Sequence, residues 1–206
     1  MKNRLLSIFT AIAVILSLSA CQNGNTEQTA PLSDSATTIV EEAVEMKTIA
    51  PPEDGWTIEK LVDTICFNGK PIQLPLSIDK LGEKYYYKDE DVVFSDTSAI
   101  VPLIYEEKVI ALMVLKDCTS IEDVSSAHAS GLILSVLDVD KSMVKHITIN
   151  GISLFDNTVN LSACLGNPTQ DNDGVWIYNI SQKNEQIMSI HYNENNEITD
   201  IYLHLN

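Results

Sequence analysis

Histidine and acidic residues are the side chains of this protein that could perform acid–base or metal chemistry. There are four histidines, His128, His146, His191 and His204. The strands expected to carry the last two pair in a register that leaves them diagonal and far apart, and the first two have no carboxylate or thiol at metal-ligand spacing. A general acid or base needs a partner that shifts its pKa. The spacing offers none, so the sequence predicts no catalytic residue, no metal ligand and no cofactor.

An acidic loop, Asp171-Asn172-Asp173-Gly174, has the composition of half a calcium-binding loop. When Gly174 is aligned with the turn glycine of an EF-hand, Thr169 falls at the first ligand position and Ile180 where the bidentate glutamate belongs. Neither side chain carries a carboxylate. The sequence therefore favours an acidic hairpin loop that ends in glycine over a calcium site.

The candidate binding residues are aromatic: Tyr85, Tyr86, Tyr87, Trp176 and Tyr178. Successive residues of a strand point to opposite faces, so at least one of the three consecutive tyrosines is expected to stand outside. Exposed tyrosine is favoured in protein and glycan contacts. The alternative is an ordinary strand start beside the acidic residues 89–91, with alternate rings buried.

The N-terminal 20 residues have the pattern of a signal peptide. Lys2 and Arg4 precede an apolar run over residues 5–20 that contains no charged side chain. A transmembrane helix needs about 20 apolar residues with flanking anchors, whereas polar residues begin here at Gln22. The pattern therefore predicts a signal peptide over residues 1–20 that is removed.

The end of this leader, Leu18-Ser19-Ala20-Cys21, resembles the lipobox of bacterial lipoproteins. The resemblance implies cleavage before Cys21, whose thiol carries diacylglycerol, with fatty chains such as palmitate holding the protein on a membrane. The expected location is outside the cytoplasm, on the outer leaflet of the plasma membrane or on an outer membrane if the host has one. The alternative is an ordinary secretory signal followed by a cysteine by chance.

The charge of the processed chain is strongly negative. Removing Lys2 and Arg4 from 13 basic residues leaves 11 lysines against 29 acidic residues, a formal charge of −18 without any arginine. An acidic surface repels phosphate backbones and anionic headgroups. Nucleic acid is thereby excluded as a partner, and the membrane is expected to be contacted only through the lipid.

Three cysteines follow Cys21: Cys66, Cys118 and Cys164. They lack the spacing of a zinc site or of a thioredoxin-like centre. An odd number cannot all pair, so the sequence leaves open one disulfide among them or three buried thiols.

The remaining chain divides into a tether and a folded part. Residues 21–54 are rich in Thr, Ser, Ala, Glu and Pro, which predicts a disordered acidic tether. Within the folded part, a pattern of alternating β-formers, Asn-Gly, a short helical stretch and Leu-Gly occurs twice, over residues 65–82 and 147–166. The sequence therefore predicts two tandem α+β repeats, at residues 55–144 and 145–206.

The second copy is the clearer one. Asn-Gly is a strong signal for a two-residue hairpin turn, and the turn sets two pairs opposite each other: Ile149 with Ile152, and Ile147 with Leu154. A helix is expected to begin with Asp156 as its N-cap and to end at Gly166. Its apolar stripe is expected to contain Val159, Leu161, Ala163, Cys164 and Leu165.

Strands are expected to follow each helix. In the first copy they cover residues 92–94, 99–105, 109–115 and 131–139, with an irregular excursion over 119–130; in the second they cover 175–180, 186–192 and 198–205. A turn on Asn195-Asn196 is expected to join the last two strands. It pairs Tyr192 with Thr199, Ile190 with Ile201, Met188 with Leu203 and His191 with Asp200.

This tandem pattern resembles the architecture of the β-lactamase inhibitory protein and of SmpA/BamE-like envelope lipoproteins. The resemblance covers residues 56–206, and its best part is residues 165–180, LGNPT…GVWIYNI. The first copy departs from the pattern, because it lacks the proline after Leu-Gly, where Glu83 and Lys84 follow. The resemblance implies short helices on one face of an antiparallel sheet and a protein partner on the opposite face or its loops.

The combined features predict a membrane-anchored, non-enzymatic module that binds a protein or assists envelope assembly. A second hypothesis is a lipoprotein that binds a small ligand or glycan between the repeats. A third is an enzyme whose active residues come together in ways that sequence spacing does not reveal. The sequence identifies neither the partner nor the oligomeric state.

Overall fold

The computed structural model describes residues 48–72, 76–178 and 188–205. All of them belong to a compact unit over residues 41–206. The leader, Cys21 and the tether up to residue 47 lie outside the described residues. No helix among the described residues is long and apolar enough to cross a membrane.

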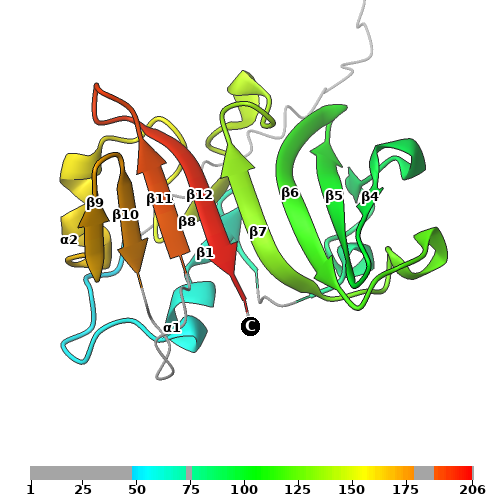
Figure 1. Ribbon diagram of the computed structural model, residues 1–206, viewed down its shortest axis with the longest axis horizontal. Coiled ribbons are helices and arrows are strands. Elements are labelled where there is room, and N and C mark those ends of the chain that lie inside the picture. Colours follow the sequence, from blue (N-terminus) through cyan, green and yellow to red (C-terminus); the bar gives the residue numbers. More distant parts are fainter. Residues whose placement is uncertain (1–47, 73–75, 179–187, 206) are drawn as a thin grey trace, which may run out of the picture. The chain divides into compact units, whose positions relative to one another are not determined.

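The described strands form two antiparallel sheets (Figure 1). The small sheet has the order β2-β1-β8, from Lys70–Pro71, Ile65–Phe67 and Ile147–Ile149. The large sheet has the order β3-β5-β6-β7-β12-β11-β10-β9, and β4 pairs with β5. Its strands are β3 (Tyr85–Tyr86), β4 (Val93–Phe94), β5 (Ser98–Tyr105), β6 (Lys108–Lys116), β7 (Ala129–Ser135), β9 (Gln170–Asn172), β10 (Val175–Tyr178), β11 (Met188–Tyr192) and β12 (Ile198–His204).

Helices are few and short. The α-helices are α1 (Ile58–Val62) and α2 (Leu161–Leu165), and the 3₁₀ turns are η1 (Ile78–Lys80), η2 (Asp89–Asp91), η3 (Ile121–Asp123), η4 (Lys141–Met143) and η5 (Thr158–Asn160). The fold is therefore mainly antiparallel β-sheet with a small helical part, in agreement with the predicted α+β class at this level.

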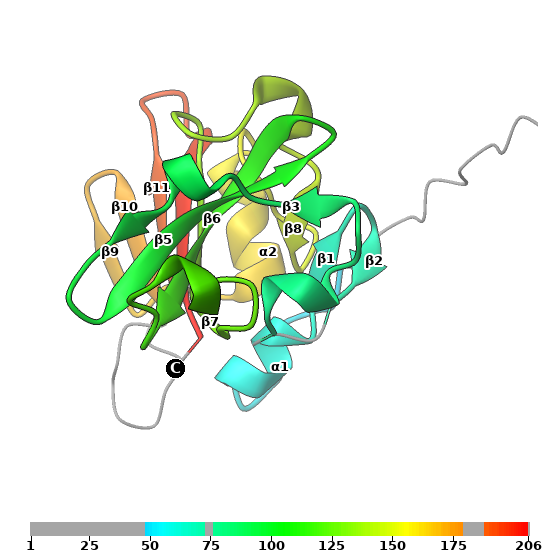
Figure 2. The ribbon, with the colours of Figure 1, turned by 90° about the vertical axis from the view of Figure 1, so that its right-hand side faces the viewer.

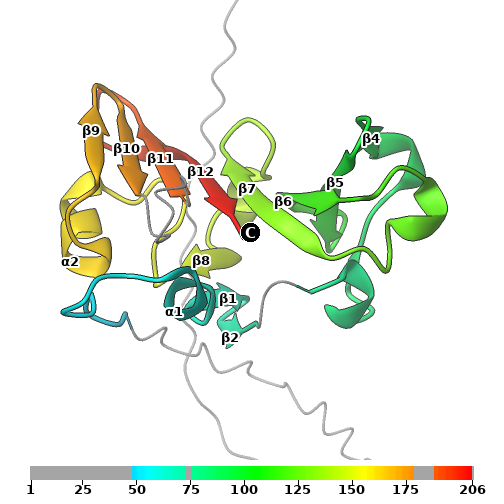
Figure 3. The same ribbon diagram turned by 60° about the horizontal axis from the view of Figure 1, so that its bottom comes forward.

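The hydrophobic core lies between the two sheets. The small sheet is behind the large one in Figure 1, to its right in Figure 2 and below it in Figure 3. Along β5, Ala99, Val101 and Leu103 are fully buried while Ile100 and Pro102 point the other way and are partly exposed. Each buried Val or Leu side chain contributes about 1.5–3 kcal/mol, so this alternation fixes which face of the sheet turns inward.

Most of the strand predictions are confirmed in both position and length. The first-copy strands begin and end within a residue of the predicted bounds, except that β7 runs over Ala129–Ser135 rather than 131–139. The strand ends predicted at residues 179–180 and 186–187 lie outside the described residues.

The pairing of β11 with β12 follows the predicted register over most of its length. Met188 lies opposite Leu203, Ile190 opposite Ile201, and His191 opposite Asp200. The predicted pair of Tyr192 with Thr199 is wrong, because Tyr192 pairs with Ile198 across a bulge. The connecting turn is wider than two residues: the Asn193 side chain accepts hydrogen bonds from the backbone N–H groups of Asn195 and Glu197 at 2.9 and 3.0 Å.

The Asn150-Gly151 turn forms as predicted, with φ angles of 49° and 79°. Ile149 and Ile152 exchange backbone hydrogen bonds of 2.9 Å across it. The predicted pairing of Ile147 with Leu154 is wrong, because the pairing ends at Ile149 and Ile152 and the chain then turns toward β12, where the Phe155 N–H donates to the Ile198 carbonyl at 2.8 Å. β1, a strand of the other half of the molecule, pairs with the opposite edge of β8, where Ile147 lies opposite Phe67.

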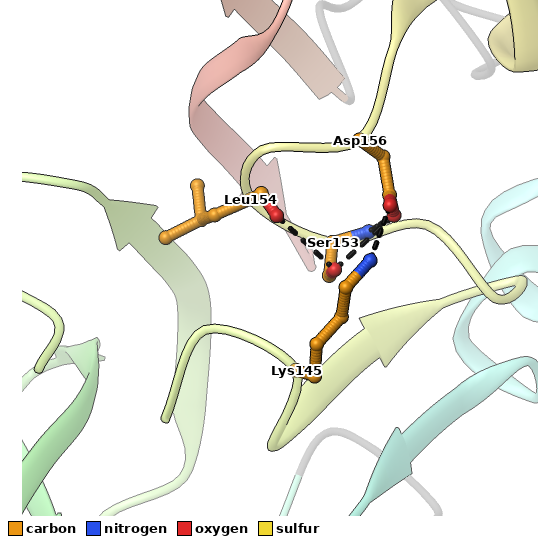
Figure 4. Close-up of polar contacts among 4 residues, drawn as sticks. All are labelled: Lys145, Ser153, Leu154 and Asp156. Carbon is orange, nitrogen blue, oxygen red and sulfur yellow. Dashed lines mark hydrogen bonds and ion pairs between the residues drawn. The ribbon is translucent and has the colours of Figure 1, made fainter. Parts of the chain in front are cut away.

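The predicted N-cap at Asp156 is also wrong. The Asn157 side chain accepts the hydrogen bond from the Val159 N–H at 2.9 Å and begins η5. The Asp156 carboxylate turns back and accepts from the Ser153 N–H at 2.7 Å and the Ser153 hydroxyl at 3.1 Å, and it also pairs with Lys145 (Figure 4). Val159 is 79 % exposed and Ala163 is exposed as well, so neither joins the predicted apolar stripe, whereas Leu161 and Leu165 are buried.

The end of the predicted tether contacts the folded part directly. The Ile49 N–H donates to the Asn150 Oδ1 at 2.8 Å, and the Asn150 Nδ2 donates to the Ile49 carbonyl at 2.8 Å. The folded part therefore begins several residues before the predicted boundary at Gly55.

Candidate functional site

A cavity of about 630 Å³ opens beside the turn that connects β1 and β2. Its walls come from β1, β2, η1, β3 and β5, and therefore from both sheets. It is lined by Phe67, Asn68, Lys70, Pro71, Ile72, Leu76, Lys80, Leu81, Gly82, Glu83, Lys84, Tyr85 and Tyr105. We call it the β1–β3 cavity.

Aromatic rings form one wall of the β1–β3 cavity. The Tyr85 ring centroid lies 5.8 Å from that of Phe67 and 5.1 Å from that of Tyr105. Tyr85 is placed there because β3 pairs with the end of β5, where Tyr85 lies opposite Tyr105. Burial raises the pKa of Tyr85 to about 12, so its hydroxyl is protonated at neutral pH.

His146 contacts two of these rings, Tyr85 and Tyr105. Its ring centroid lies 4.3 Å from that of Tyr105, and its Nε2 is 3.3 Å from the Tyr85 hydroxyl. His146 is 8 % exposed, and this burial lowers the pKa of its imidazole. The Glu106 carboxylate raises the pKa, but by less. The neutral imidazole is thus the form that the folded protein favours.

This pKa shift predicts a loss of stability in mild acid. The unfolded chain takes up a proton at His146 near pH 6.5, whereas the folded protein resists protonation until lower pH. The contribution of neutral His146 to the free energy of unfolding is therefore fully present above pH 6.5 and is lost as the pH falls below it. Urea unfolding at several pH values between 7.5 and 5.5 should show a smaller decline for His146→Gln than for the wild type. Equal declines would contradict this role for His146.

Three lysines, Lys70, Lys80 and Lys84, surround the mouth of the β1–β3 cavity and are exposed. The Lys84 Nζ lies 6.0 Å from the centroid of the Tyr105 ring, within cation–π range. Glu83 is the acidic residue in the lining. On a chain with a formal charge of −16, this lining carries three lysines against one glutamate next to aromatic rings, and the Lys80 Nζ also lies 3.7 Å from the Asp79 carboxylate.

The structure brings only part of the predicted binding set to this cavity. Tyr85 lines it, whereas Tyr86 and Tyr87 are half-buried and do not line it. Trp176 is half-buried on β10, near the opposite edge of the large sheet. Tyr178 is 4 % exposed, and its hydroxyl donates to the Gly166 carbonyl at 3.4 Å, so its ring offers little contact surface.

Sequence reasoning did not single out Asn68, the three lysines or His146 as parts of one site. From the sequence alone, the repeated Asn-Gly indicates only a turn. The lysines are spread over residues 70–84 without a run of like charge, so their convergence depends on how η1 and β3 fold around the β1–β2 turn.

The other reactive side chains of the described part are in structural positions. Cys66, Cys118 and Cys164 are free thiols, and burial raises the pKa of each. Ser153 is fully buried, and its hydroxyl is engaged by Asp156 (Figure 4). Within residues 48–72, 76–178 and 188–205, no group of three or more His, Cys, Asp or Glu side chains is arranged to hold a metal ion.

Comparison with known proteins finds no match: no protein-family model matches the chain, and neither a curated protein nor a solved structure is similar to it.

Proposed function

We propose that the protein is a lipid-anchored extracytoplasmic module that binds a protein partner without catalysing a reaction. The observation that carries this proposal is the β1–β3 cavity, which combines an aromatic wall with three lysines on an otherwise acidic chain. Aromatic residues beside charged groups are typical of protein-binding hot spots. Complementary charge would guide an acidic partner to this face.

The proposed anchor is the lipidated Cys21, after removal of residues 1–20. Two or more acyl chains hold a protein on a bilayer durably. The tether would hold the module away from an anionic membrane surface, which its negative charge disfavours. The localisation follows: outside the cytoplasm, on the plasma membrane or on an outer membrane.

We also propose that the module consists of two tandem repeats with their helices on one face of the large sheet. The strand order supports it, since β3, β5, β6 and β7 of the first half are followed by β12, β11, β10 and β9 of the second in reverse. In Figures 2 and 3, α1 and α2 lie on the same side of the large sheet as the small sheet. These features are those expected from the resemblance to β-lactamase inhibitory protein and SmpA/BamE-like folds.

A second candidate is a lipoprotein that binds a small ligand or glycan. The volume of the β1–β3 cavity, about 630 Å³, falls within the range of about 300–1,000 Å³ that is usual for small-molecule sites. Tyrosine rings can stack on a sugar ring as well as on a peptide side chain.

Capture of partners from envelope extracts distinguishes these functions. The lipid-anchored full chain should retain a stoichiometric protein, and the double variant K80E/K84E should retain at least about tenfold less because it reverses the charge at the mouth of the cavity. Lys116→Glu is the matched control, since Lys116 lies at the far end of β6 from Tyr105. Capture of polysaccharide without protein would favour the second candidate. Capture of equal amounts of protein by the double variant and the wild type would contradict the claim that the β1–β3 cavity is the binding site.

A further inference from the structure

Each half of the molecule carries the same turn beside the same strand pair. β1 and β8 pair antiparallel, with Cys66 opposite Thr148 at the centre. The strands then run into Asn68-Gly69 and Asn150-Gly151, whose φ angles are 48° and 73° in the first turn and 49° and 79° in the second. The two turns therefore occupy corresponding positions at opposite ends of the β1–β8 pair.

In the second half, the protein's own chain occupies the surface beside this turn. The Asn150 side chain is 2 % exposed and binds both backbone polar groups of Ile49, each at 2.8 Å. Its Nδ2 also donates to the carbonyl of Cys164 at 2.8 Å. One asparagine thus holds the backbone of Ile49 against the end of α2.

The same segment makes close contacts at both ends of this surface. A Cβ added at Gly151 would meet the Thr48 Oγ1 at 2.7 Å, and one added at Gly166 would meet the Pro51 Cβ at 3.7 Å. Residues 48–51 therefore run from the Asn-Gly turn to the Leu-Gly that ends α2.

In the first half, the corresponding surface lines the β1–β3 cavity. Asn68 takes the place of Asn150, Lys80 that of Cys164, and Gly82 that of Gly166, and all three first-half residues line the cavity. Asn68 is exposed rather than buried. A Cβ at Gly82 would meet no described atom within 4 Å, in contrast to Gly166.

We propose that the β1–β3 cavity binds an extended peptide segment of the partner protein, held by the Asn68 side chain as Asn150 holds Ile49. This inference rests on the proposed function and identifies the kind of partner. An asparagine amide presents both an acceptor and donors, which match the N–H and carbonyl of one peptide residue. The Lys80 carbonyl is the expected additional acceptor for Asn68.

The bound segment carries carboxylates. Lys70, Lys80 and Lys84 surround the cavity, whereas the corresponding surface of the second half is bordered by Asp156 and Asn157 and lacks a lysine in its lining. The first-half surface therefore selects an acidic segment, by an attraction that salt weakens.

The test uses a fluorescent peptide that copies residues 48–54, Thr-Ile-Ala-Pro-Pro-Glu-Asp, added to the full chain. This peptide contains the segment already seated in the second half and ends in two carboxylates. A second peptide has Gln-Asn in place of Glu-Asp. The acidic peptide should bind more tightly than its amide version, and the difference should shrink as salt is added.

The Asn68→Gly variant tests whether the Asn68 side chain holds the bound segment. Glycine accepts the positive φ of this turn, so the substitution removes the amide without straining the backbone. The acidic peptide should bind Asn68→Gly about tenfold more weakly or worse. Asn196→Gly is the matched control because Asn196 also has a positive φ, 61°, but lies in the turn between β11 and β12. The affinity of this variant for the acidic peptide should equal that of the wild type.

Three results would overturn the inference. Equal binding of the acidic peptide by Asn68→Gly and wild type would contradict the role of the Asn68 side chain. Failure of both peptides to bind would contradict the claim that the cavity binds a peptide segment. Self-association of the full chain that is lost in Asn68→Gly would assign the cavity to a second copy. Should a protein partner still be captured with undiminished yield by Asn68→Gly, the proposed function would stand without this inference.

Discussion

Replacing Asn150 by glycine is expected to lower the free energy of unfolding by about 3 kcal/mol, at about 1 kcal/mol for each of the hydrogen bonds lost. The buried Asn150 amide makes three of them, two to Ile49 and one to Cys164. Glycine retains the positive φ of 49°, so the loss comes from the side chain and not from the turn. Urea denaturation should show the lower midpoint, and proteolysis near residue 49 should become faster.

Asn68→Gly provides the matched comparison. The backbone conformation is nearly the same, with φ of 48°, but the Asn68 side chain is exposed. Its removal is expected to change the free energy of unfolding by less than about 0.5 kcal/mol. If the two variants are destabilised equally, the segment over residues 48–51 is not held by Asn150 in the way the hydrogen bonds indicate.

Replacing Cys21 by serine is expected to release the protein from the membrane completely. The hydroxyl cannot take the place of the thiol in the thioether to diacylglycerol, and each buried methylene of the acyl chains contributes about 0.8 kcal/mol to membrane binding. In detergent-phase separation, the wild type should enter the detergent phase and Cys21→Ser should remain in the aqueous phase with its leader uncleaved or cleaved elsewhere.

Cys164→Ser is the control for this experiment, since Cys164 is a partly buried thiol of the folded part. It should partition like the wild type. A wild-type protein whose mass shows an unmodified Cys21, and which stays in the aqueous phase, would contradict the proposed anchor and the localisation that follows from it.

Local patterns in the sequence predict much of this fold. Alternating apolar residues locate β5, β6 and β12, because a strand with one buried face repeats every two residues. The Asn-Gly and Leu-Gly dipeptides locate the turns and the end of α2, because positive φ angles favour asparagine and glycine. These signals involve residues that are close in the sequence, so they can be recognised from the sequence alone.

The errors occur where distant residues compete with local ones. The segment after Ile152 leaves β8 because Phe155 and Asp156 form backbone hydrogen bonds with Ile198 of β12, about 40 residues later in the chain. The Asp156 carboxylate pairs with Lys145, 11 residues earlier in the chain, and accepts from the nearby Ser153 N–H instead of capping the helix. Local capping and turn rules contain no information on such partners.

The candidate site could be predicted least. The sequence points to Tyr85 because tyrosine is frequent at interfaces, but its neighbours Tyr105 and His146 come from β5 and from the chain just before β8. The correspondence between Asn68 and Asn150 was visible as a repeated dipeptide. Only the position of Ile49 against one of the two turns indicates what the other turn can bind.

The most direct test of the account is to follow the side-chain amide signals of Asn68 and Asn150 by NMR in the isotope-labelled protein, assigned with the two glycine variants. In the free protein, the Asn150 amide protons should exchange slowly with solvent and those of Asn68 rapidly. On addition of the acidic peptide, the Asn68 signals should shift and their exchange should slow, while those of Asn150 stay unchanged. Asn68 signals that remain unaffected at saturating peptide would contradict the claim that this turn holds a partner's backbone.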